Sequence, residues 1–210
     1  MGCDLSTFGY AESPPSESEG VNFPTPVEIV QHKIILVGDI SVGKSSLVQR
    51  LLGKEFREEH ISTIGTAFAS VSIQPKEDME AITIQVWDTA GEERYRSMSR
   101  FFFRGTQVGI LVFDVQVHDS LRKLKSWQED IEGVSPTASF VVVANKIDCD
   151  DEMLRTVSRE EGEQFAEEIH AQYVETSAKT GEGVLAMFRI AALLSMKSNS
   201  AYSNAVVVSS

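Results

Sequence analysis

Residues 38–45 (GDISVGKS) match the pattern G-x-x-x-x-G-K-[ST]. The segment follows an apolar, β-branched run and opens a helical pattern, which is the usual context of a phosphate-binding loop. Glycines let the backbone curl so that successive N–H groups face a phosphate, helped by the helix N-terminus. Lys44 then reaches the terminal phosphate oxygens, and the Ser45 hydroxyl is a ligand for Mg²⁺. A glycine turn with a surface lysine would not explain this position, so the segment predicts a nucleotide site.

A second acidic position lies in the segment Trp87-Asp-Thr-Ala-Gly91, where a carboxylate ends an apolar run. The carboxyl end of a strand lies beside the ligand crevice of a parallel sheet. There, Asp88 can hold a water on Mg²⁺, and the Gly91 N–H can meet a γ-phosphate. Asp-x-x-Gly alone is a common turn. Its place downstream of the phosphate loop is what favours a functional role.

Residues 145–148 (NKID) follow another apolar run and predict recognition of a base. Asp148 can accept two hydrogen bonds from guanine, from N1–H and the exocyclic amine, and adenine offers no such pair of donors. A wrong base would leave this carboxylate unpaired, so the selectivity for guanine is expected to be strong. Asn145 ties loops together, and Lys146 can lie along the base. In residues 176–179 (TSAK), the N–H of Ala178 can donate to guanine O6.

The elements that must position these residues alternate along the chain. Helical patterns cover residues 44–52, 120–131, 158–170 and 184–196. Strand-like runs cover 32–37, 81–87, 108–115 and 139–144, with weaker candidates at 67–73 and 172–175. Such alternation predicts an α/β fold in a single P-loop domain: a six-stranded, mostly parallel sheet with one antiparallel strand and about five helices on both faces.

Composition excludes several functional classes. The net charge of −12 argues against nucleic acid, which needs a basic surface. The only cysteines are Cys3 and Cys149, too few for a disulfide framework, so a reducing compartment is expected. No apolar run is long enough to span a bilayer, and the N-terminus lacks the features of a secretory signal. We therefore expect a soluble, intracellular body.

The segments GDISVGKSS, STIG, WDTAG, NKID and ETSAK together resemble the Ras superfamily of small GTPases over residues 31–197. STIGTAF, WDTAGEERYRSM and FFFRGT are most similar to the Rab family, and within it to the early-endosomal branch. The resemblance implies GTP/GDP and Mg²⁺ as cofactors. It implies Mg²⁺ ligation by Ser45, Thr63 and, through a water, Asp88. The implied GTP-binding residues are Gly38, Ser41, Val42, Gly43, Lys44, Ser45, Ser46, Phe56, Thr63, Asp88, Gly91, Asn145, Lys146, Asp148, Ser177, Ala178 and Lys179.

The resemblance also assigns particular roles to aromatic residues. Phe56 is expected to stack on guanine. Ile64, Phe68, Trp87 and Phe102 are expected to form the surface that effector proteins read in the GTP state. Further partners implied are an exchange factor and an activating protein, and the implied process is vesicle and endosomal trafficking.

Three positions depart from the family pattern. Glu92 stands where the family has the glutamine that orients the attacking water, and it adds negative charge beside the phosphates. Ile40 replaces a small residue and would crowd an incoming catalytic arginine, and Ser41 replaces the usual glycine at a conformational cost.

With a catalytic set of Glu92, Lys44, Thr63 and Gly91, we expect slow GTP hydrolysis. The alternatives are compensation elsewhere, or a pseudo-GTPase that stays GTP-bound as a recruitment platform. An ATPase is disfavoured by Asp148.

The N-terminal residues MGCDLS fit the myristoylation pattern M-G-x-x-x-[ST], which predicts acylation of Gly2. The sequence ends in VVVSS rather than in the cysteine pair that Rab proteins prenylate. One myristoyl chain gives marginal binding, so we expect palmitoylation of Cys3 as the second signal. The features resemble N-myristoylated early-endosomal Rab variants. Residues 1–30 are thus an acylated, disordered arm, 31–197 the GTPase domain and 198–210 a flexible tail, on the cytoplasmic face of endosomal membranes.

Overall fold

The computed structural model describes residues 32–57, 66–89, 101–149 and 154–207, and for Thr66 and residues 199–207 the backbone only. Within these ranges the strands are β1 (His32–Val37), β2 (Thr66–Ile73), β3 (Ile82–Thr89), β4 (Val108–Asp114), β5 (Ser139–Asn145) and β6 (Gln172–Thr176). The helices are α1 (Lys44–Leu51), α3 (His118–Arg122), α4 (Leu124–Glu132), α5 (Arg159–Glu168) and α6 (Val184–Val207).

The strands form one six-stranded sheet in the order β2-β3-β1-β4-β5-β6. β2 pairs antiparallel with β3, and the other neighbouring strands are parallel. The predicted α/β fold, a mostly parallel sheet with one antiparallel strand, is confirmed. Residues 74–81 connect the antiparallel pair.

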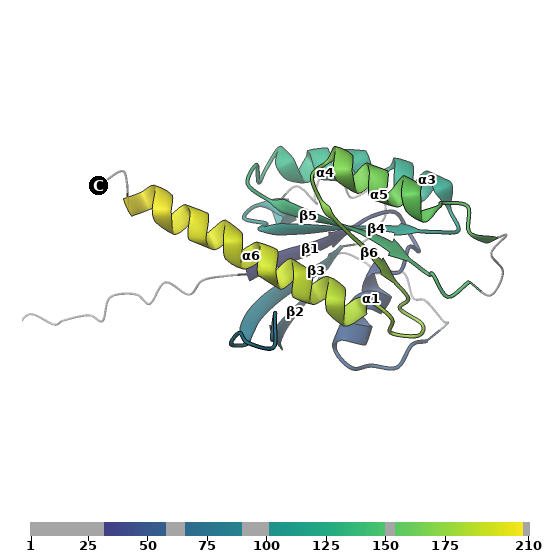
Figure 1. Ribbon diagram of the computed structural model, residues 1–210, viewed down its shortest axis with the longest axis horizontal. Coiled ribbons are helices and arrows are strands. Elements are labelled where there is room, and N and C mark those ends of the chain that lie inside the picture. The colour runs from purple at the N-terminus through teal and green to yellow at the C-terminus, as the bar shows by residue number, and fades with distance from the viewer. Residues whose placement is uncertain (1–31, 58–65, 90–100, 150–153, 208–210) are drawn as a thin grey trace, which may run out of the picture.

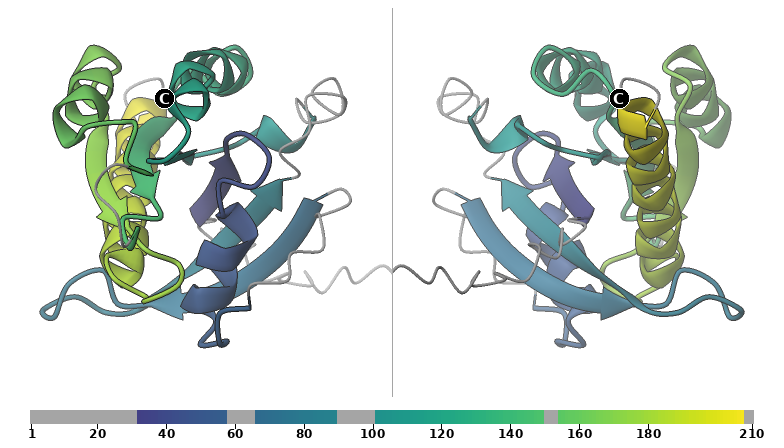
Figure 2. Two further views of the ribbon diagram at one scale, coloured as in Figure 1. Left: turned by 90° about the vertical axis from the view of Figure 1, so that its right-hand side faces the viewer. Right: turned by 90° about the vertical axis from the view of Figure 1, so that its left-hand side faces the viewer.

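Helices cover both faces of this sheet, which explains the apolar sequences of its central strands (Figures 1 and 2). Ile34 and Leu36 of β1 point into the core beneath α1 and α6, whereas Ile35 and Val37 point into the core beneath α3, α4 and α5. All four side chains are fully buried. A strand buried on both faces has no need of alternating polar residues, so its sequence is a continuous apolar run.

Two helices differ from the pattern predicted by the sequence. The helix expected over residues 120–131 is divided at Lys123 into α3 and α4. The last helix was expected to end at residue 196, with a loose tail after it, but α6 runs on to Val207. No glycine or proline follows Gly183 in the sequence, so nothing there stops the helix. Figure 1 shows this last part of α6 projecting beyond the sheet.

Candidate functional site

The phosphate loop runs from the end of β1 to the start of α1, as predicted. Its two glycines leave no room for a side chain: a Cβ on Gly38 would lie 2.1 Å from the Val112 carbonyl oxygen, and one on Gly43 2.3 Å from Asn145 Nδ2. Both also have positive φ angles, 144° and 98°. Close approach and backbone conformation therefore both require glycine here.

Ser41 adopts a φ of 61°, in the left-handed region that L-residues other than glycine rarely occupy. The conformational cost expected for serine at this position is therefore present in the structure. Its neighbours differ in burial: Ile40 is 50% exposed, whereas Val42 is 2% exposed and packs into the core beneath α1. Ile40 thus presents its branched side chain at the outer surface of the loop.

Lys44 is buried at the first position of α1, and its Nζ donates to the carbonyl oxygens of Gly38 and Asp39, at 2.9 and 2.8 Å. Burial lowers the pKa of Lys44 to about 8, against the opposing effects of Asp88 and Asp39. Two carbonyl groups of the phosphate loop therefore hold the Lys44 ammonium within the loop. Ser46, two residues further along the same helix, is also buried.

Asp88 lies near the end of β3, opposite Leu36 of β1, and is 3% exposed. Burial raises the pKa of this carboxyl, while a hydrogen bond from Ser45 and the charge of Lys44 act in the opposite direction. Asp88 Oδ1 is buried without a hydrogen-bond partner among the described residues. A carboxylate and a hydroxyl side by side, with an unpaired buried oxygen, are the donors that Mg²⁺ prefers. These residues therefore fit the ion.

Asn145, fully buried at the end of β5, joins three loops. Its Nδ2 donates to the Val42 carbonyl at 2.8 Å, and its Oδ1 accepts from Thr176 Oγ1 at 3.1 Å and from the Ala178 N–H at 3.2 Å. The predicted tying role of Asn145 thus has a definite geometry. The Ala178 N–H, predicted to donate to guanine O6, has a partner within the protein.

The two loops predicted to contact guanine, residues 145–148 and 176–179, are called the guanine-reading loops here, and they contact each other beside this asparagine. Asp148 Oδ1 accepts from the Ser177 hydroxyl, which in turn accepts from the Thr180 N–H. Lys146 has a φ of 68°, and its Nζ lies 2.6 Å from Asp114 Oδ2. Lys179 is exposed.

Two of the residues that hold these loops were missed by the sequence analysis. Asp114 ends β4, and its contact with Lys146 joins neighbouring strand ends. Arg50 of α1 donates to the carbonyl oxygens of Ala178 and Lys179. The signal for Asp114 was a lone carboxylate that ends an apolar strand. Arg50 carried no signal, because its partners lie far away in the sequence.

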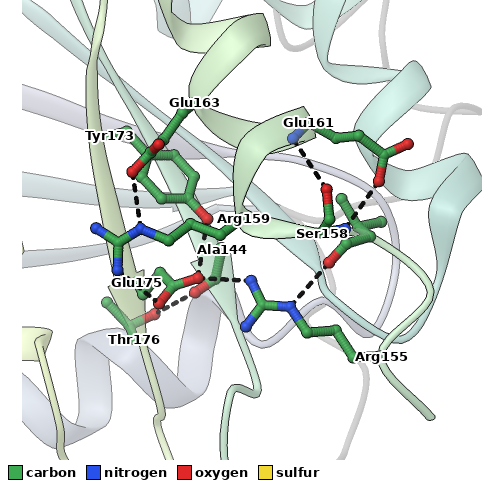
Figure 3. Close-up of polar contacts among 10 residues, drawn as sticks. Ala144, Arg155, Ser158, Arg159, Glu161, Glu163, Tyr173, Glu175 and Thr176 are labelled. Atoms are coloured by element: carbon green, nitrogen blue, oxygen red, sulfur yellow. Dashed lines mark hydrogen bonds and ion pairs between the residues drawn. The ribbon is translucent and has the colours of Figure 1, made fainter. Parts of the chain in front are cut away.

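A further polar network lies at the C-terminal end of β6 (Figure 3). Glu175 accepts from Arg155 and from the Tyr173 hydroxyl, and its second oxygen lies 3.4 Å from Arg159. Arg155 also donates to the Val157 carbonyl, and desolvation opposes the rise in its pKa caused by Glu175. The network joins the segment after the guanine-reading loop to the strand that leads into TSAK.

The aromatic residues expected to meet effectors lie together. The Trp87 ring centroid is 5.1 Å from that of Phe68 and 6.0 Å from that of Phe102, and Lys33 Nζ lies 4.8 Å from the Trp87 centroid. Phe68 is 54% exposed, so this aromatic cluster presents an apolar side chain at the surface. Phe56, predicted to stack on guanine, is partly buried and packs against the core beneath α1 and α6.

Several predicted residues lie outside the described part of the chain. They are the proposed acylation sites Gly2 and Cys3, the predicted Mg²⁺ ligand Thr63 and the predicted effector contact Ile64. Gly91 and Glu92, from the predicted catalytic set, also lie outside it. In the described part, no helix is both long and apolar enough to cross a membrane.

The glycine loop between β1 and α1, with the polar loops that end β3, β5 and β6, defines a nucleotide-binding α/β protein of the P-loop class. The Ras family model matches residues 33–196. The chain is 37% identical to GTP-binding protein ypt5 of Schizosaccharomyces pombe, over 79% of this chain and 78% of ypt5. It is 34% identical to GTP-binding protein YPT52 of Saccharomyces cerevisiae, over 77% and 80% of the two chains. It is 39% identical to Ras-related protein Rab-18 of Caenorhabditis briggsae, over 74% and 76%.

The chain therefore belongs to the Ras family of small GTPases, and within it to the Rab proteins. In common with that family it binds GTP and GDP with Mg²⁺ and regulates vesicle trafficking through effectors, exchange factors and activating proteins. The resemblance found in the sequence is confirmed at this level.

Proposed function

We propose that the chain is a GTP-driven switch on endosomal membranes that recruits effectors while GTP is bound and hydrolyses GTP slowly. The observation that carries this proposal is the cluster of Lys44, Asp88 and Ser45 beside the loops that Asn145 ties together. The cluster offers charge and oxygen ligands to phosphate and Mg²⁺. The neighbouring loops offer the Asp148 carboxylate to guanine.

Each part of the nucleotide has a proposed set of contacts. Ser45 and Thr63 would hold Mg²⁺ directly and Asp88 through a water, and the bound ion supplies charge compensation for the phosphates. Lys44 would move from the carbonyls of Gly38 and Asp39 to phosphate oxygens, to which its charge is better suited. Gly91 would donate its N–H to the γ-phosphate.

The proposed contacts of the base and the inner phosphates use the remaining predicted residues. Asp148 would accept from the guanine edge, between Lys146 on one side and the ring of Phe56 on the other. The backbone of the phosphate loop would donate to the β-phosphate. The residues that contribute this backbone, or line the base, are Gly38, Ser41, Val42, Gly43, Ser46, Ser177, Ala178 and Lys179.

Slow turnover follows from two side chains. Glu92 can accept a hydrogen bond from the attacking water but cannot donate an amide hydrogen, and its charge opposes the charge on the phosphate. Ile40, half exposed at the loop surface, would obstruct an arginine from an activating protein. Such an arginine contributes a factor of roughly 10³–10⁵ to hydrolysis where it acts.

A pseudo-GTPase is the second candidate function. Glu92 and Ile40 favour it, because both weaken the hydrolytic machinery. The intact ligands for Mg²⁺ and phosphate, Ser45, Thr63 and Asp88, favour the switch. Under either function, we propose that Ile64, Phe68, Trp87 and Phe102 present the surface that effectors contact.

We propose attachment to the cytoplasmic face of endosomal membranes through a myristoyl group on Gly2 and a palmitoyl group on Cys3. Two chains are needed because one gives marginal affinity. In this proposal residues 1–30 are an arm between membrane and domain, residues 31–197 are the switch domain and residues 198–210 follow it. The resemblance of residues 62–68 (STIGTAF) to the early-endosomal branch supports the compartment.

Single-turnover phosphate release from the full chain loaded with GTP and Mg²⁺ tests the switch. We expect Glu92→Gln to release phosphate faster than the parent, and Ile40→Gly to do so when an activating protein is added. If the parent releases phosphate at an ordinary small-GTPase rate and Glu92→Gln is no faster, slow hydrolysis is wrong and the chain is a conventional GTPase switch. If neither releases phosphate, the platform is right. An excess of ATP that displaces GTP would overturn guanine recognition itself.

A further inference from the structure

Asp114 is a buried carboxylate at the end of β4. β4 lies next to β5, the strand that ends in a guanine-reading loop (Figure 1). Asp114 is 4% exposed and pairs in register with Asn145 of β5. Its Oδ1 accepts from the Gln116 N–H at 2.9 Å, and its Oδ2 lies 2.6 Å from Lys146 Nζ. A carboxylate in such a place is costly unless both oxygens have partners, and here both do.

Lys146 is held at both ends. Its backbone, at a φ of 68°, lies between two fixed neighbours: the Asn145 carbonyl accepts from the Val115 N–H at 3.1 Å, and the Ile147 N–H donates to the Thr176 carbonyl at 3.3 Å. Asp114 fixes its ammonium. The aliphatic stem between these ends therefore cannot turn freely into solvent, although 37% of the side chain is exposed.

The ion pair also defines what Lys146 can do. Its ammonium contacts the Asp114 carboxylate directly, whereas the direct partners of the Lys44 ammonium are the neutral carbonyls of Gly38 and Asp39. Lys146 is thus suited to contact through its stem rather than to attract phosphate. A long side chain that is already ordered loses less entropy when a flat ligand packs against it.

We propose that Asp114 is a positioning residue for nucleotide binding, which fixes the Lys146 stem as a preformed surface for one face of the base. The inference rests on the proposed place of Lys146 along guanine. Because Asp114 acts on the face of the base, it does not take part in the edge recognition made by Asp148. Its removal should weaken the binding of GDP and of GTP by the same factor. The binding of any other purine nucleotide with the same flat ring should weaken by that factor too.

The test is the dissociation rate of labelled GDP and of labelled IDP, whose base lacks the exocyclic amine, from the full chain with Mg²⁺. We expect Asp114→Asn to release both nucleotides faster by the same factor, on the order of tenfold. Asparagine keeps an acceptor for the Gln116 N–H and loses the charge that holds Lys146. Ser120→Ala is the matched control, because Ser120 hydrogen-bonds the backbone N–H and carbonyl of Asp114 without contacting the carboxylate.

Parental rates in Asp114→Asn would overturn the proposal. Equal acceleration of release in Ser120→Ala would also overturn it, because the effect would then come from the local stability at the end of β4. A faster release of GDP without a faster release of IDP would overturn it as well. If Asp114→Asn does not fold, Asp114→Glu replaces it: a carboxylate longer by one methylene displaces Lys146 Nζ, and parental rates would again overturn the proposal. A parent that binds neither GDP nor GTP would instead refute the proposed function.

Discussion

Asn145 Nδ2 donates to the carbonyl oxygen of Val42 at 2.8 Å, joining the guanine-reading loop to a phosphate loop 103 positions earlier in the chain. The same amide group occupies the space that a Cβ on Gly43 would need. The predicted phosphate and base sites are therefore joined directly. We expect a ligand that orders one loop to order the other.

Replacement of Asn145 by alanine should therefore damage the whole site. The substitution leaves the Val42 carbonyl, the Thr176 hydroxyl and the Ala178 N–H without their buried partner. We expect the free energy of unfolding to fall by about 3 kcal/mol, measured by denaturant titration with GDP and Mg²⁺ present. Thr176→Val removes only one of the three contacts, so it should cost about 1 kcal/mol. Equal losses in the two variants would show that Asn145 does not join the loops.

Ser41→Gly should stabilise the protein. Ser41 has a φ of 61°, a conformation that costs a residue with a Cβ roughly 1–2 kcal/mol and costs glycine nothing. Part of the gain is offset by the greater freedom of glycine in the unfolded chain, so we expect a net gain of about 0.5 kcal/mol in the free energy of unfolding. The measurement is denaturant titration of the GDP-loaded protein. The same change inside α4, Ser126→Gly, should destabilise instead, and a loss in both variants would refute the strain at Ser41.

His32 should make stability depend on pH. Its Nδ1 lies 2.9 Å from Ser195 Oγ, and because that hydroxyl donates to the Ala192 carbonyl, it accepts from His32. Burial lowers the pKa of His32 below the ordinary 6.5. The unfolded chain then binds the proton more tightly than the folded one, so the contribution of His32 is complete above pH 6.5 and is lost as the pH falls towards the folded pKa.

Thermal unfolding of the GDP-loaded protein between about pH 7 and pH 5 measures this effect. In His32→Gln the side-chain amide can still donate to Ser195 and has no proton to gain. We expect the melting temperature of this variant to fall less on acidification than that of the parent. Parallel curves for the two proteins would assign the acid sensitivity to other groups.

The sequence predicts the sheet well because buried parallel strands are apolar runs, and β1 begins and ends where the pattern does. Gly38 and Lys44 could also be predicted, because both belong to one short motif of the sequence. Asp114 and Arg50 were missed because their roles depend on which strands and helices become neighbours. The length of α6 was underestimated because an amphipathic pattern shows where a helix packs, and α6 continues beyond the sheet that it packs against.

Stable membrane attachment should need both of the acyl groups proposed for the N-terminus. A single myristoyl chain binds membranes with a constant on the order of 10⁴ M⁻¹, so the protein would leave them on dilution. We expect the parent, isolated from cells that acylate it, to float with vesicles after dilution. Cys3→Ser should be released, and Gly2→Ala should not bind at all.

Cys149→Ser is the matched control, because Cys149 is the other cysteine of the chain and lies partly buried beside the core beneath α3, α4 and α5. Its membrane binding should equal that of the parent, and the intact mass of each protein reports which acyl groups it carries. Retention of Cys3→Ser on diluted vesicles would show that Cys3 is not the second signal. A parent without a myristoyl group would refute the anchor, while leaving nucleotide binding, which depends on residues of the folded domain, untouched.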